Sequence, residues 1–495
     1  MRRIDSNTPD LPLFDVARTR DIESRALAGL PAHALMQRAG EAVARLALAL
    51  APHARTVRVV AGPGNNGGDG LDAAIRLQQA GKQVEVVLPG EPQADDARDA
   101  LARARDAGVP ILDGARTPLG NHDLAIDALL GIGARRAAEG AVRASIEALN
   151  ALPCPVLAID LPSGLSADTG QPLGAAVGAM HTLSLLTLKP GLFTAAGRDH
   201  AGTVWFDDLG VDTVADEPVA RLGGALASPA TQRRHAQHKG SFGDVAVIGG
   251  AQGMTGAAVL ASRAALAAGA GRVFVEMLDP VAPALDPGRP ELMVRPGWSH
   301  RVDRETLAGS TVVCGCGGGD AVRAVLPALL GSCVRLVLDA DALNAIAADA
   351  ALQQQLAARC TRHQATVLTP HPLEAARLLG CGVAEVQADR LAAGQRLADQ
   401  SGCVVVLKGS GSVIASAGRT PRINASGNAS LATAGTGDVL AGWLGAEWAQ
   451  RRESDPQEGA WQAAVHAVWW HGAAAEAAGA PVLRAADLIE WMARR

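Results

Sequence analysis

Short apolar runs alternate with longer amphipathic stretches through most of the chain. Residues 32–50 show the apolar spacing of a helix, residues 56–61 form an apolar run typical of a strand, and residues 70–80 return to helical spacing. Two further strand-like runs, 123–128 and 155–160, carry an Asp at or next to their ends. Strands that alternate with helices predict a parallel sheet whose functional groups gather where the strands end.

The same alternation starts again in the second half, where residues 256–270 have helical spacing. Strand-like runs occur at residues 244–250, 272–276, 311–314, 334–341, 366–372 and 403–409. Before them, residues 211–237 mix Asp, Glu, Pro, Gly and Arg without periodicity, which places a domain boundary near 215–230. We therefore expect two α/β domains, residues 1–220 and residues 225–495.

Composition narrows the class of protein. A chain of 495 residues is too long for one ordinary domain, and its apolar fraction of 48% is enough for two cores. The net charge of −5, the aromatic fraction of 3% and the absence of Tyr argue against a nucleic-acid partner. No apolar run reaches about 18 residues, so no membrane span is expected. Seven scattered Cys and a polar N-terminus without a signal peptide favour a cytoplasmic protein.

Lysine is scarce in this chain, which uses Arg at most basic positions. Three of the four Lys, at 189, 239 and 408, stand before Gly or Pro-Gly. Because Lys carries a compact point charge that Arg does not, these positions are candidates for functional charges. Genomic base composition and chance would give the same pattern, so both interpretations stay open.

The first candidate site begins with a Gly-rich segment, residues 62–70, between a predicted strand and a predicted helix. Backbone N–H groups in such a segment face phosphate or pyrophosphate, although a plain strand-to-helix turn has the same outline. Asp127 and Asp160 lie at the ends of the next two strands, and Ser163 follows the second. With Asn66, the oxygens of Asp127 and Ser163 suit a hard monovalent cation, and Asp160 is left as a general acid or base. Helix N-capping is the competing interpretation of both aspartates.

These segments together resemble the NAD(P)H-hydrate epimerase domain, over about residues 12–215. The resemblance is carried by residues 62–70, 127–133, 160–164, 188–192 and 35–40. It implies a Rossmann-like three-layer αβα domain that interconverts the R and S epimers of NAD(P)HX, the hydrated form of NAD(P)H. It also implies K⁺ held by Asn66, Asp127 and Ser163. The substrate contacts implied are Asn65, Asn66, Gly67, Gly68, Asp69, Gly131, Ile132, Gly133, Ala134, Arg135, Arg136, Ala137 and Asp160.

The second candidate site combines Gly-Thr-Gly-Asp at residues 435–438, which opens a predicted helix, with Lys-Gly-Ser-Gly-Ser at residues 408–412. Helix N–H groups stabilise an anionic phosphoryl group, and Asp438 can take a hydroxyl proton. Lys408 adds a point charge beside a nucleotide. In this order the two motifs resemble the ribokinase-like superfamily, which implies a second αβα domain.

Further motifs at residues 238–243, 256–258, 369–374 and 428–438 resemble the ADP- or ATP-dependent NAD(P)HX dehydratase, over about residues 230–490. Mg²⁺ is then expected on the nucleotide phosphates. The substrate contacts implied are Ala257, Gly317, His371 and Asp438, with Asp438 as the catalytic base. The nucleotide contacts implied are Lys408, Gly409, Ser410, Gly411, Ser412 and Gly437.

Two positions qualify this assignment. The family commonly has Gly-Pro-Gly-Leu-Gly where this chain has Gly-Cys-Gly-Gly-Gly at residues 315–319, so the loop is less preorganised and the assignment of Gly317 is weaker. His371, taken alone, fits a structural histidine, and its Thr-Pro-His-Pro context favours the functional interpretation.

The sequence thus predicts a bifunctional repair enzyme acting on NADHX and NADPHX, with ADP and ATP both open as co-substrate. Catalysis is assigned to Asp160 in the first domain and Asp438 in the second. The alternative is a ribokinase-like small-molecule kinase with a non-catalytic N-terminal binding domain. A dehydrogenase fits less well, because the Asn-Asn insertion departs from the usual dinucleotide loop and leaves the second half unexplained. Ala-rich helix faces permit a homo-oligomer without specifying one.

Overall fold

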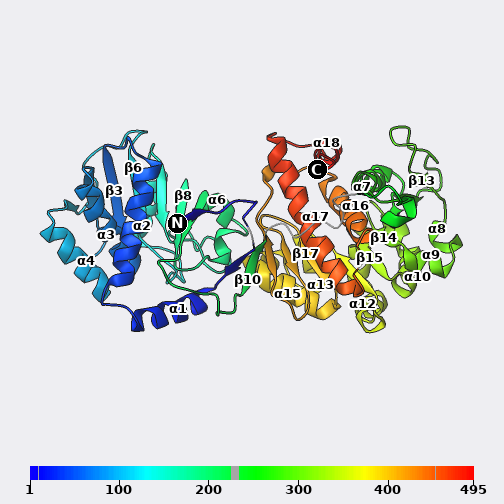
Figure 1. The fold of residues 1–495 in the computed structure, drawn as a ribbon, viewed down its shortest axis with the longest axis horizontal. Coiled ribbons are helices and arrows are strands. Elements are labelled where there is room, and N and C mark those ends of the chain that lie inside the picture. The colour runs from blue at the N-terminus through cyan, green and yellow to red at the C-terminus, as the bar shows by residue number, and fades with distance from the viewer. Residues whose placement is uncertain (9, 224–232, 452, 495) are drawn as a thin grey trace. The chain divides into compact units, whose positions relative to one another are not determined.

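The structure is a computed structural model, and it describes residues 1–8, 10–223, 233–451 and 453–494. The chain forms two compact units (Figure 1). The first contains Met1–Asp5 and Pro12–Ala220, and the second contains Ser6–Leu11 and Arg221–Arg495. Residues 224–230 of the predicted boundary lie outside the described residues.

The first unit is built on an eight-stranded sheet in the order β1-β9-β8-β7-β6-β3-β4-β5. Every neighbouring pair is parallel except β1 and β9, which are antiparallel. Its strands are β1 (Arg2–Arg3), β3 (Thr56–Ala61), β4 (Gln83–Val87), β5 (Ile111–Leu112), β6 (Leu124–Ala128), β7 (Val156–Ile159), β8 (His181–Leu185) and β9 (Thr203–Asp207). Its helices are α1 (Val16–Ala28), α2 (Ala34–Leu50), α3 (Asn65–Gln79), α4 (Asp95–Asp106), α5 (Gly140–Asn150), α6 (Gly197–Ala201) and the 3-10 helix η1 (Pro190–Leu192).

Helices cover both faces of this sheet, as a parallel sheet requires. Neighbouring strand residues point into different cores: Val59 packs in the core that also holds α2, α3 and α4, whereas Val60 packs in the core beside α5. The continuous apolar runs seen in the sequence follow from this, because each strand is buried on both sides. The predicted three-layer αβα arrangement is confirmed for this unit.

The Gly-rich segment differs from its prediction as a loop followed by a helix at residue 70. Helix α3 begins at Asn65, so most of the segment forms the first turns of the helix. The glycines are needed for packing. A Cβ on Gly62 would lie 1.8 Å from the Leu129 carbonyl oxygen, and one on Gly67 would lie 1.9 Å from that of Gly62. The start of α3 is therefore pressed against the end of β6.

The second unit is built on an eleven-stranded sheet in the order β13-β12-β11-β14-β15-β16-β17-β18-β19-β10-β2. The strands from β13 to β17 are parallel, and β18 pairs antiparallel with both β17 and β19. The strands are β2 (Leu11–Leu13), β10 (Ala220–Gly223), β11 (Asp244–Gly249), β12 (Arg272–Met277), β13 (Met293–Val294), β14 (Thr311–Cys314), β15 (Arg335–Leu338), β16 (Ala365–Leu368), β17 (Val404–Leu407), β18 (Val413–Ala415) and β19 (Arg422–Asn424).

Two layers of helices enclose this second sheet. One face carries α7 (Thr255–Ala267), α16 (Thr436–Ala449), α17 (Pro456–Ala478) and α18 (Ala485–Met492), in one core with Val245 and Val247. Ala246 and Ile248 of the same strand point into the opposite core. The remaining helices are α8 (Trp298–Arg301), α9 (Arg304–Gly309), α10 (Leu326–Ser332), α11 (Asp341–Ala347), α12 (Ala350–Ala357), α13 (Pro372–Leu379), α14 (Val383–Ala388) and α15 (Arg390–Ser401), with the 3-10 helices η2 (Lys239–Phe242), η3 (Asp320–Ala324), η4 (Cys360–Arg362) and η5 (Ala429–Leu431). The predicted α/β class is confirmed here too.

The segment Ser6–Leu11 belongs to the second unit, although it stands near the start of the chain. Asp10 pairs with Arg221 at 2.5 Å and with Arg422 at 2.9 Å, and the Trp469 indole donates to the Ser6 carbonyl oxygen at 2.8 Å. The chain therefore enters the second unit twice, which no pattern in the sequence indicated.

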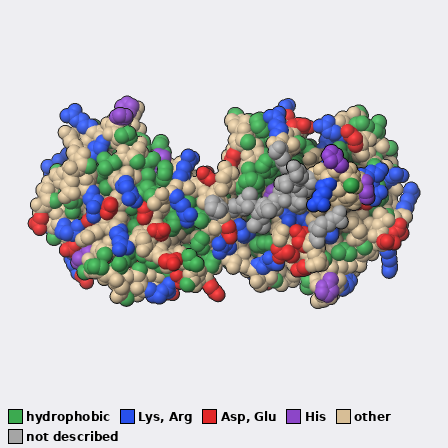
Figure 2. Space-filling view, viewed as in Figure 1, with side chains coloured by type: hydrophobic (Ala, Val, Ile, Leu, Met, Phe, Trp, Pro, Cys, Tyr) green, Lys and Arg blue, Asp and Glu red, His purple; other side chains and the backbone are tan. Residues whose placement is uncertain are grey.

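Charged side chains of both signs are interspersed on the face drawn in Figure 2, in keeping with the small net charge of −5. Among the described helices, none combines the length and the apolar character needed to traverse a bilayer.

Candidate active sites

A cavity of about 520 Å³ opens at the carboxyl ends of the strands in the first unit. Helix α1 supplies Glu23 to its wall, the segment at the start of α3 supplies Asn65, and the segment after β6 supplies Gly131. Asp160 and Lys189 are among the charged residues of the lining. The volume lies in the range of pockets that enclose a small molecule.

Asp160 and Lys189 form an ion pair in this cavity. Asp160 follows β7 with φ 67°, a left-handed conformation that a non-Gly residue adopts at a cost and that is often found at functional sites. Lys189 is 1% exposed and also donates to the carbonyl oxygens of Leu185 at 2.7 Å and Thr187 at 2.9 Å. The ammonium is thereby fixed, and it holds the Asp160 carboxyl group in the cavity wall.

Two more carboxyl groups face the same cavity. Burial, followed by the charge of Asp160, raises the pKa of Asp69 well above its usual value. The same two causes raise the pKa of Glu23, against the nearby charges of Lys189 and Arg20. The wall therefore combines Asp160, paired with Lys189, with two carboxyl groups that retain their protons to higher pH, and such a mixture suits proton transfer in both directions.

Asp127 and Ser163 lie buried together behind the cavity wall. The Ser163 hydroxyl donates to Asp127 Oδ1 at 2.6 Å and its N–H donates to Oδ2 at 2.8 Å. Burial raises the pKa of Asp127 to about 6, although these bonds and the Leu129 N–H oppose the shift. Within the described ranges Asp127 has no cationic partner. Asn66 is 8% exposed, its Nδ2 atom has no hydrogen-bond partner, and its side chain lies against Gly131.

The capping interpretation of the two aspartates is wrong. Helix α5, the next helix after Asp127, has Glu139 at its N-cap, and η1, the first helical turn after Asp160, has Lys189. Neither aspartate begins a helix in the described structure, because each strand end leads into a turn that folds back over the sheet.

The structure gathers most of the predicted epimerase set. The predicted residues that line the cavity are Asn65, Asn66, Asp69, Gly131, Ile132, Gly133, Ala134 and Asp160. Gly67 and Gly68 instead face protein, since a Cβ on Gly68 would lie 2.4 Å from Met36 Cε. Arg135, Arg136 and Ala137 are exposed and do not line the cavity. No motif in the sequence indicated Glu23, whereas Lys189 was marked by the scarcity of Lys and by its place in residues 188–192.

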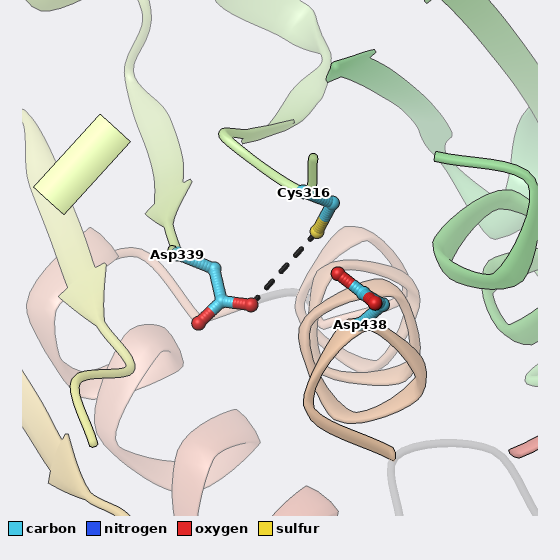
Figure 3. A group of neighbouring side chains, drawn as sticks. All are labelled: Cys316, Asp339 and Asp438. Atoms are coloured by element: carbon cyan, nitrogen blue, oxygen red, sulfur yellow. Dashed lines mark hydrogen bonds between the residues drawn. The ribbon is translucent and has the colours of Figure 1, made fainter. Parts of the chain in front are cut away.

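The second site is organised around Asp339, at the end of β15. Its Oδ1 atom accepts from Lys408 Nζ at 2.7 Å and from the Thr369 hydroxyl at 2.7 Å. Its Oδ2 atom lies 3.9 Å from Cys316 Sγ, and Asp438 of α16 stands on the other side of that thiol (Figure 3). Ligand atoms of Cys316, Asp339 and Asp438 all lie within 4.8 Å of one another. Two carboxylates and one ammonium therefore meet at one point.

Asp438 lies in an environment that tunes its proton affinity. Burial raises its pKa to about 6, the charge of Asp339 adds to the shift, and a hydrogen bond from Cys316 opposes it. Burial opposes the charge on Lys408, but Asp339 and Glu374 outweigh that effect and raise the pKa of this ammonium. A base with a pKa near 6 is ionised at neutral pH and still accepts a proton readily.

The predicted dehydratase residues fall into two groups around this point. A Cβ on Gly317, whose φ is 59°, would lie 2.8 Å from Ala257 Cβ, so these two predicted substrate contacts are neighbours. A Cβ on Gly437 would lie 3.3 Å from Lys408 Nζ, which joins the two nucleotide motifs. Gly409 and Gly411 have positive φ, and the Ser412 hydroxyl donates to the Gly409 carbonyl oxygen at 3.2 Å, so residues 408–412 form a tight turn.

Buried Arg390 binds the backbone at the start of that turn, a role that the sequence did not indicate. It is 1% exposed, and its Nη2 atom donates to the carbonyl oxygens of Leu407 at 3.2 Å and Lys408 at 3.1 Å. Asp339 was visible in the sequence as the acidic end of an apolar run, but its role as the common partner of Thr369, Lys408 and Cys316 was not.

His371 has a structural role in this arrangement. Its Nδ1 atom accepts from the N–H groups of Leu373 at 3.1 Å and Glu374 at 3.3 Å, which caps helix α13. Its Nε2 atom lies 3.2 Å from Glu374 Oε1. Burial raises the pKa of Glu374 to about 7, with Lys408 opposing the shift. The contact of His371 with substrate stays a prediction.

Comparison with protein families identifies two matching family models. One, described as NAD(P)H-hydrate dehydratase, matches residues 245–490. The other, described as YjeF-related protein N-terminus, matches residues 32–191.

Curated relatives match both halves at once. The bifunctional NAD(P)H-hydrate repair enzyme Nnr of Escherichia coli K12 is 37% identical over 476 residues, which cover 93% of this chain and 88% of the relative. The bifunctional NAD(P)H-hydrate repair enzyme of Leishmania braziliensis is 37% identical over 519 residues, which cover 96% and 92%. Among solved structures, an ADP/ATP-dependent NAD(P)H-hydrate dehydratase from Bacillus subtilis, co-crystallised with ATP and Mg²⁺, is 29% identical over 53% of this chain and 92% of that one, with a TM-score of 0.43.

Proposed function

This chain belongs to the family of bifunctional NAD(P)H-hydrate repair enzymes, and from that premise we propose how its two sites divide the work. The enzyme epimerises R- and S-NAD(P)HX and dehydrates the S epimer to NAD(P)H at the expense of ADP or ATP. The observation that supports this most strongly is the 37% identity that spans 93% of the chain and therefore includes both sites. A kinase with a non-catalytic N-terminal domain does not explain that span.

Epimerisation is assigned to the cavity of the first unit. Asp160 accepts and returns a proton of the hydrated substrate, and Lys189 holds its carboxyl group in place. Asp69 and Glu23, whose pKa values burial raises, hold protons on the same wall and serve as donors or as hydrogen-bond partners of the hydroxyl group. The substrate lies along residues 64–66 and 131–134, which line the cavity.

A potassium ion belongs to this site in our proposal. The residues fit it, because Asp127 is a buried carboxylate without a cationic partner in the described structure, and neutral oxygens of Ser163 and Asn66 belong to the same part of the fold. One negative charge among neutral oxygens offsets a monovalent ion better than a dehydrated divalent one. Bound K⁺ would supply a positive potential behind the substrate wall.

Dehydration is assigned to the second unit. Asp438 removes the proton of the substrate hydroxyl, and the hydroxyl oxygen takes the terminal phosphoryl group, which leaves the nucleotide one phosphate shorter. The phosphate then departs as the neighbouring ring carbon loses a proton, and the ring double bond of NAD(P)H forms. Lys408 and the turn at residues 408–412 hold the nucleotide phosphates together with Gly437 at the start of α16. Mg²⁺ bound to those phosphates would neutralise part of their charge, as is usual for phosphoryl transfer.

The test uses the full-length chain and a mixture of both NADPHX epimers. The parent protein should restore the full NADPH absorbance when ATP or ADP is added. Asp438→Asn should lower the dehydration rate by about 10²- to 10⁴-fold, because an amide keeps the shape but takes no proton. Asp160→Asn should consume the S epimer at the parental rate and then stall with the R epimer left over.

Epimer composition, followed by chromatography without nucleotide, provides the cross-check. Asp438→Asn should equilibrate the epimers at the parental rate and Asp160→Asn should not. If Asp160→Asn equilibrated them normally, or if Asp438→Asn restored NADPH at the parental rate, the corresponding assignment would be withdrawn.

A further inference from the structure

The wall of the first cavity carries more acidic than basic side chains. The acidic side chains are Glu23, Asp69, Asp96 and Asp160, and the basic ones are Arg20 and Lys189. Lys189 is buried and committed to Asp160. Arg20 is therefore the basic group of this wall that remains available to a ligand.

Arg20 differs from its neighbours on helix α1. Arg18 pairs with Asp15 at 3.3 Å, and Arg25 pairs with Asp216. Within the described part of the chain Arg20 makes no hydrogen bond or ion pair, and its charge acts on the cavity by lowering the pKa of Glu23. The other two arginines of the helix thus form ion pairs with aspartates that do not line the cavity. Arg20, on the turn that faces the cavity, is the one whose guanidinium is free in the described structure.

The place of Arg20 in the wall connects it to the start of helix α3. A Cβ on Gly133 would lie 3.4 Å from Arg20 Nη2, and one on Gly131 would lie 3.3 Å from Asn66 Cβ. In the segment after β6, Gly133 thus lies beside Arg20, and Gly131 lies beside Asn66 in the first turn of α3. That turn has no side-chain cap, and its free N–H groups also favour an anion.

We propose that Arg20 binds a phosphate group of the dinucleotide substrate and so determines its affinity for the epimerase site. The inference rests on the proposed function, since it takes the hydrated dinucleotide as the ligand. Both substrates carry a pyrophosphate, and NADPHX carries an additional phosphate on the ribose. A planar guanidinium forms paired charge-assisted hydrogen bonds with phosphate, which the exposed position of Arg20 leaves it free to make.

The experiment measures epimerisation of R-NADHX and R-NADPHX separately, by chromatography without nucleotide, in the parent, Arg20→Ala, Arg20→Lys and Arg25→Ala. Arg20→Ala should raise KM about tenfold, the lower end expected for loss of a charge-assisted hydrogen bond, and should leave kcat within about twofold. Arg20→Lys should recover part of the affinity, because Lys restores the charge but cannot form the paired hydrogen bonds of a guanidinium. Arg25→Ala lies on the same helix and should behave as the parent.

Comparison of NADHX with NADPHX shows which phosphate group of the substrate Arg20 binds. A rise in KM for both identifies the pyrophosphate as the partner of Arg20, and a rise for NADPHX alone identifies the ribose phosphate. The KM of the parent should also increase with salt, and Arg20→Ala should lose most of that dependence. An unchanged KM for both substrates, or a loss confined to kcat, would overturn the proposal. Failure of the parent to equilibrate the epimers would instead contradict the proposed function. The kcat of epimerisation, expected to stay within about twofold, reports that the first unit of each variant is folded.

Discussion

Two of the four lysines, Lys189 and Lys408, each lie against an aspartate at the end of a parallel strand. In each site a non-Gly residue with positive φ stands at that point: Asp160 itself in the first and Ala340, next to Asp339, in the second. The backbone turns sharply there, which separates consecutive side chains and aims a carboxylate at the ligand. Both sites thus pair a fixed ammonium with a strained strand end.

At the same scale, we expect Cys316 to influence the pH dependence of dehydration. Its hydrogen bond lowers the pKa of Asp438, which burial and Asp339 raise to about 6. Asp438 must be ionised to accept the hydroxyl proton, so kcat/KM should fall as the pH drops through that value. Cys316→Ala removes the opposing bond and should move this acid limb to higher pH. The pH profile of kcat/KM with S-NADPHX, taken between about pH 5 and pH 8, measures the shift.

Cys333→Ala is the matched control, because Cys333 is a buried thiol of the same unit whose neighbouring charge is Arg359. It should leave the acid limb unchanged even if it lowers stability. A limb that stays in place, or moves to lower pH, in Cys316→Ala would show that the thiol does not act on Asp438.

Individual site residues could be predicted only where the sequence marked them locally. Asp160 and Asp438 stand in recognisable motifs, and the structure places the first in a cavity wall and the second beside Cys316 and Asp339; their catalytic roles stay predictions. Asp339 and Lys408 are 69 residues apart, and their contact exists only because β15 and β17 belong to the same sheet. Glu23 enters the first site from a helix with no motif, so only tertiary packing reveals it.

At the scale of elements, the apolar runs located the central strands of both sheets, because each of these strands is buried on both faces. The start of α3 was placed five residues too late, since glycines that normally end helices are required here by close packing against Leu129 and Met36. The pattern does not predict the short strands β1 and β2 at sheet edges, or β10 beside β2, because two to four residues carry too little periodicity.

The proposed potassium site is also an element-scale feature, because β6, the turn after β7 and α3 each contribute one residue to it. Addition of KCl should raise the unfolding midpoint of the parent above that in tetramethylammonium chloride of equal concentration. A ligand at a hundredfold excess over its Kd stabilises by about 2.7 kcal/mol. Asp127→Asn should lose this increment, because it removes the single negative charge. Calorimetry of the full-length chain provides the measurement.

Asp123→Asn is the control, since Asp123 precedes the same strand at its other end and accepts from the Thr56 N–H at 2.9 Å. It should keep the potassium increment. Equal midpoints of the parent in the two salts would remove the potassium assignment without affecting that of Asp160.

At the scale of the whole molecule, the double entry of the chain into the second unit links its first residues to dehydration. Asp10→Asn should destabilise the second unit by about 1 kcal/mol, because Arg422 is 8% exposed at its side chain and loses a charged partner. Dehydration should therefore be lost at lower temperature than in the parent, while epimerisation is lost at the parental temperature. Thermal inactivation of the two activities, assayed separately, measures this.

Asp212→Asn changes an exposed turn of the first unit, where Asp212 accepts from the Val214 N–H at 2.9 Å, and should leave dehydration unaffected. Equal thermal inactivation of dehydration in Asp10→Asn and the parent would mean that the Asp10 pairs add nothing to stability. Assembly into a homo-oligomer and a cytoplasmic location stay predictions from composition.

During synthesis, the segment Ser6–Leu11 is made long before the residues that bind it. It leaves the ribosome among the first residues, yet Arg422 and Trp469, which hold it, are made more than 400 residues later. At about 5–20 residues per second the nascent chain carries this segment unpaired for roughly 20 to 80 seconds, while Pro12–Ala220 is already complete. The growing chain must therefore keep a short, mostly polar segment available until Trp469 has been made, and a ribosome that stops before Arg422 releases a chain in which this segment has neither partner.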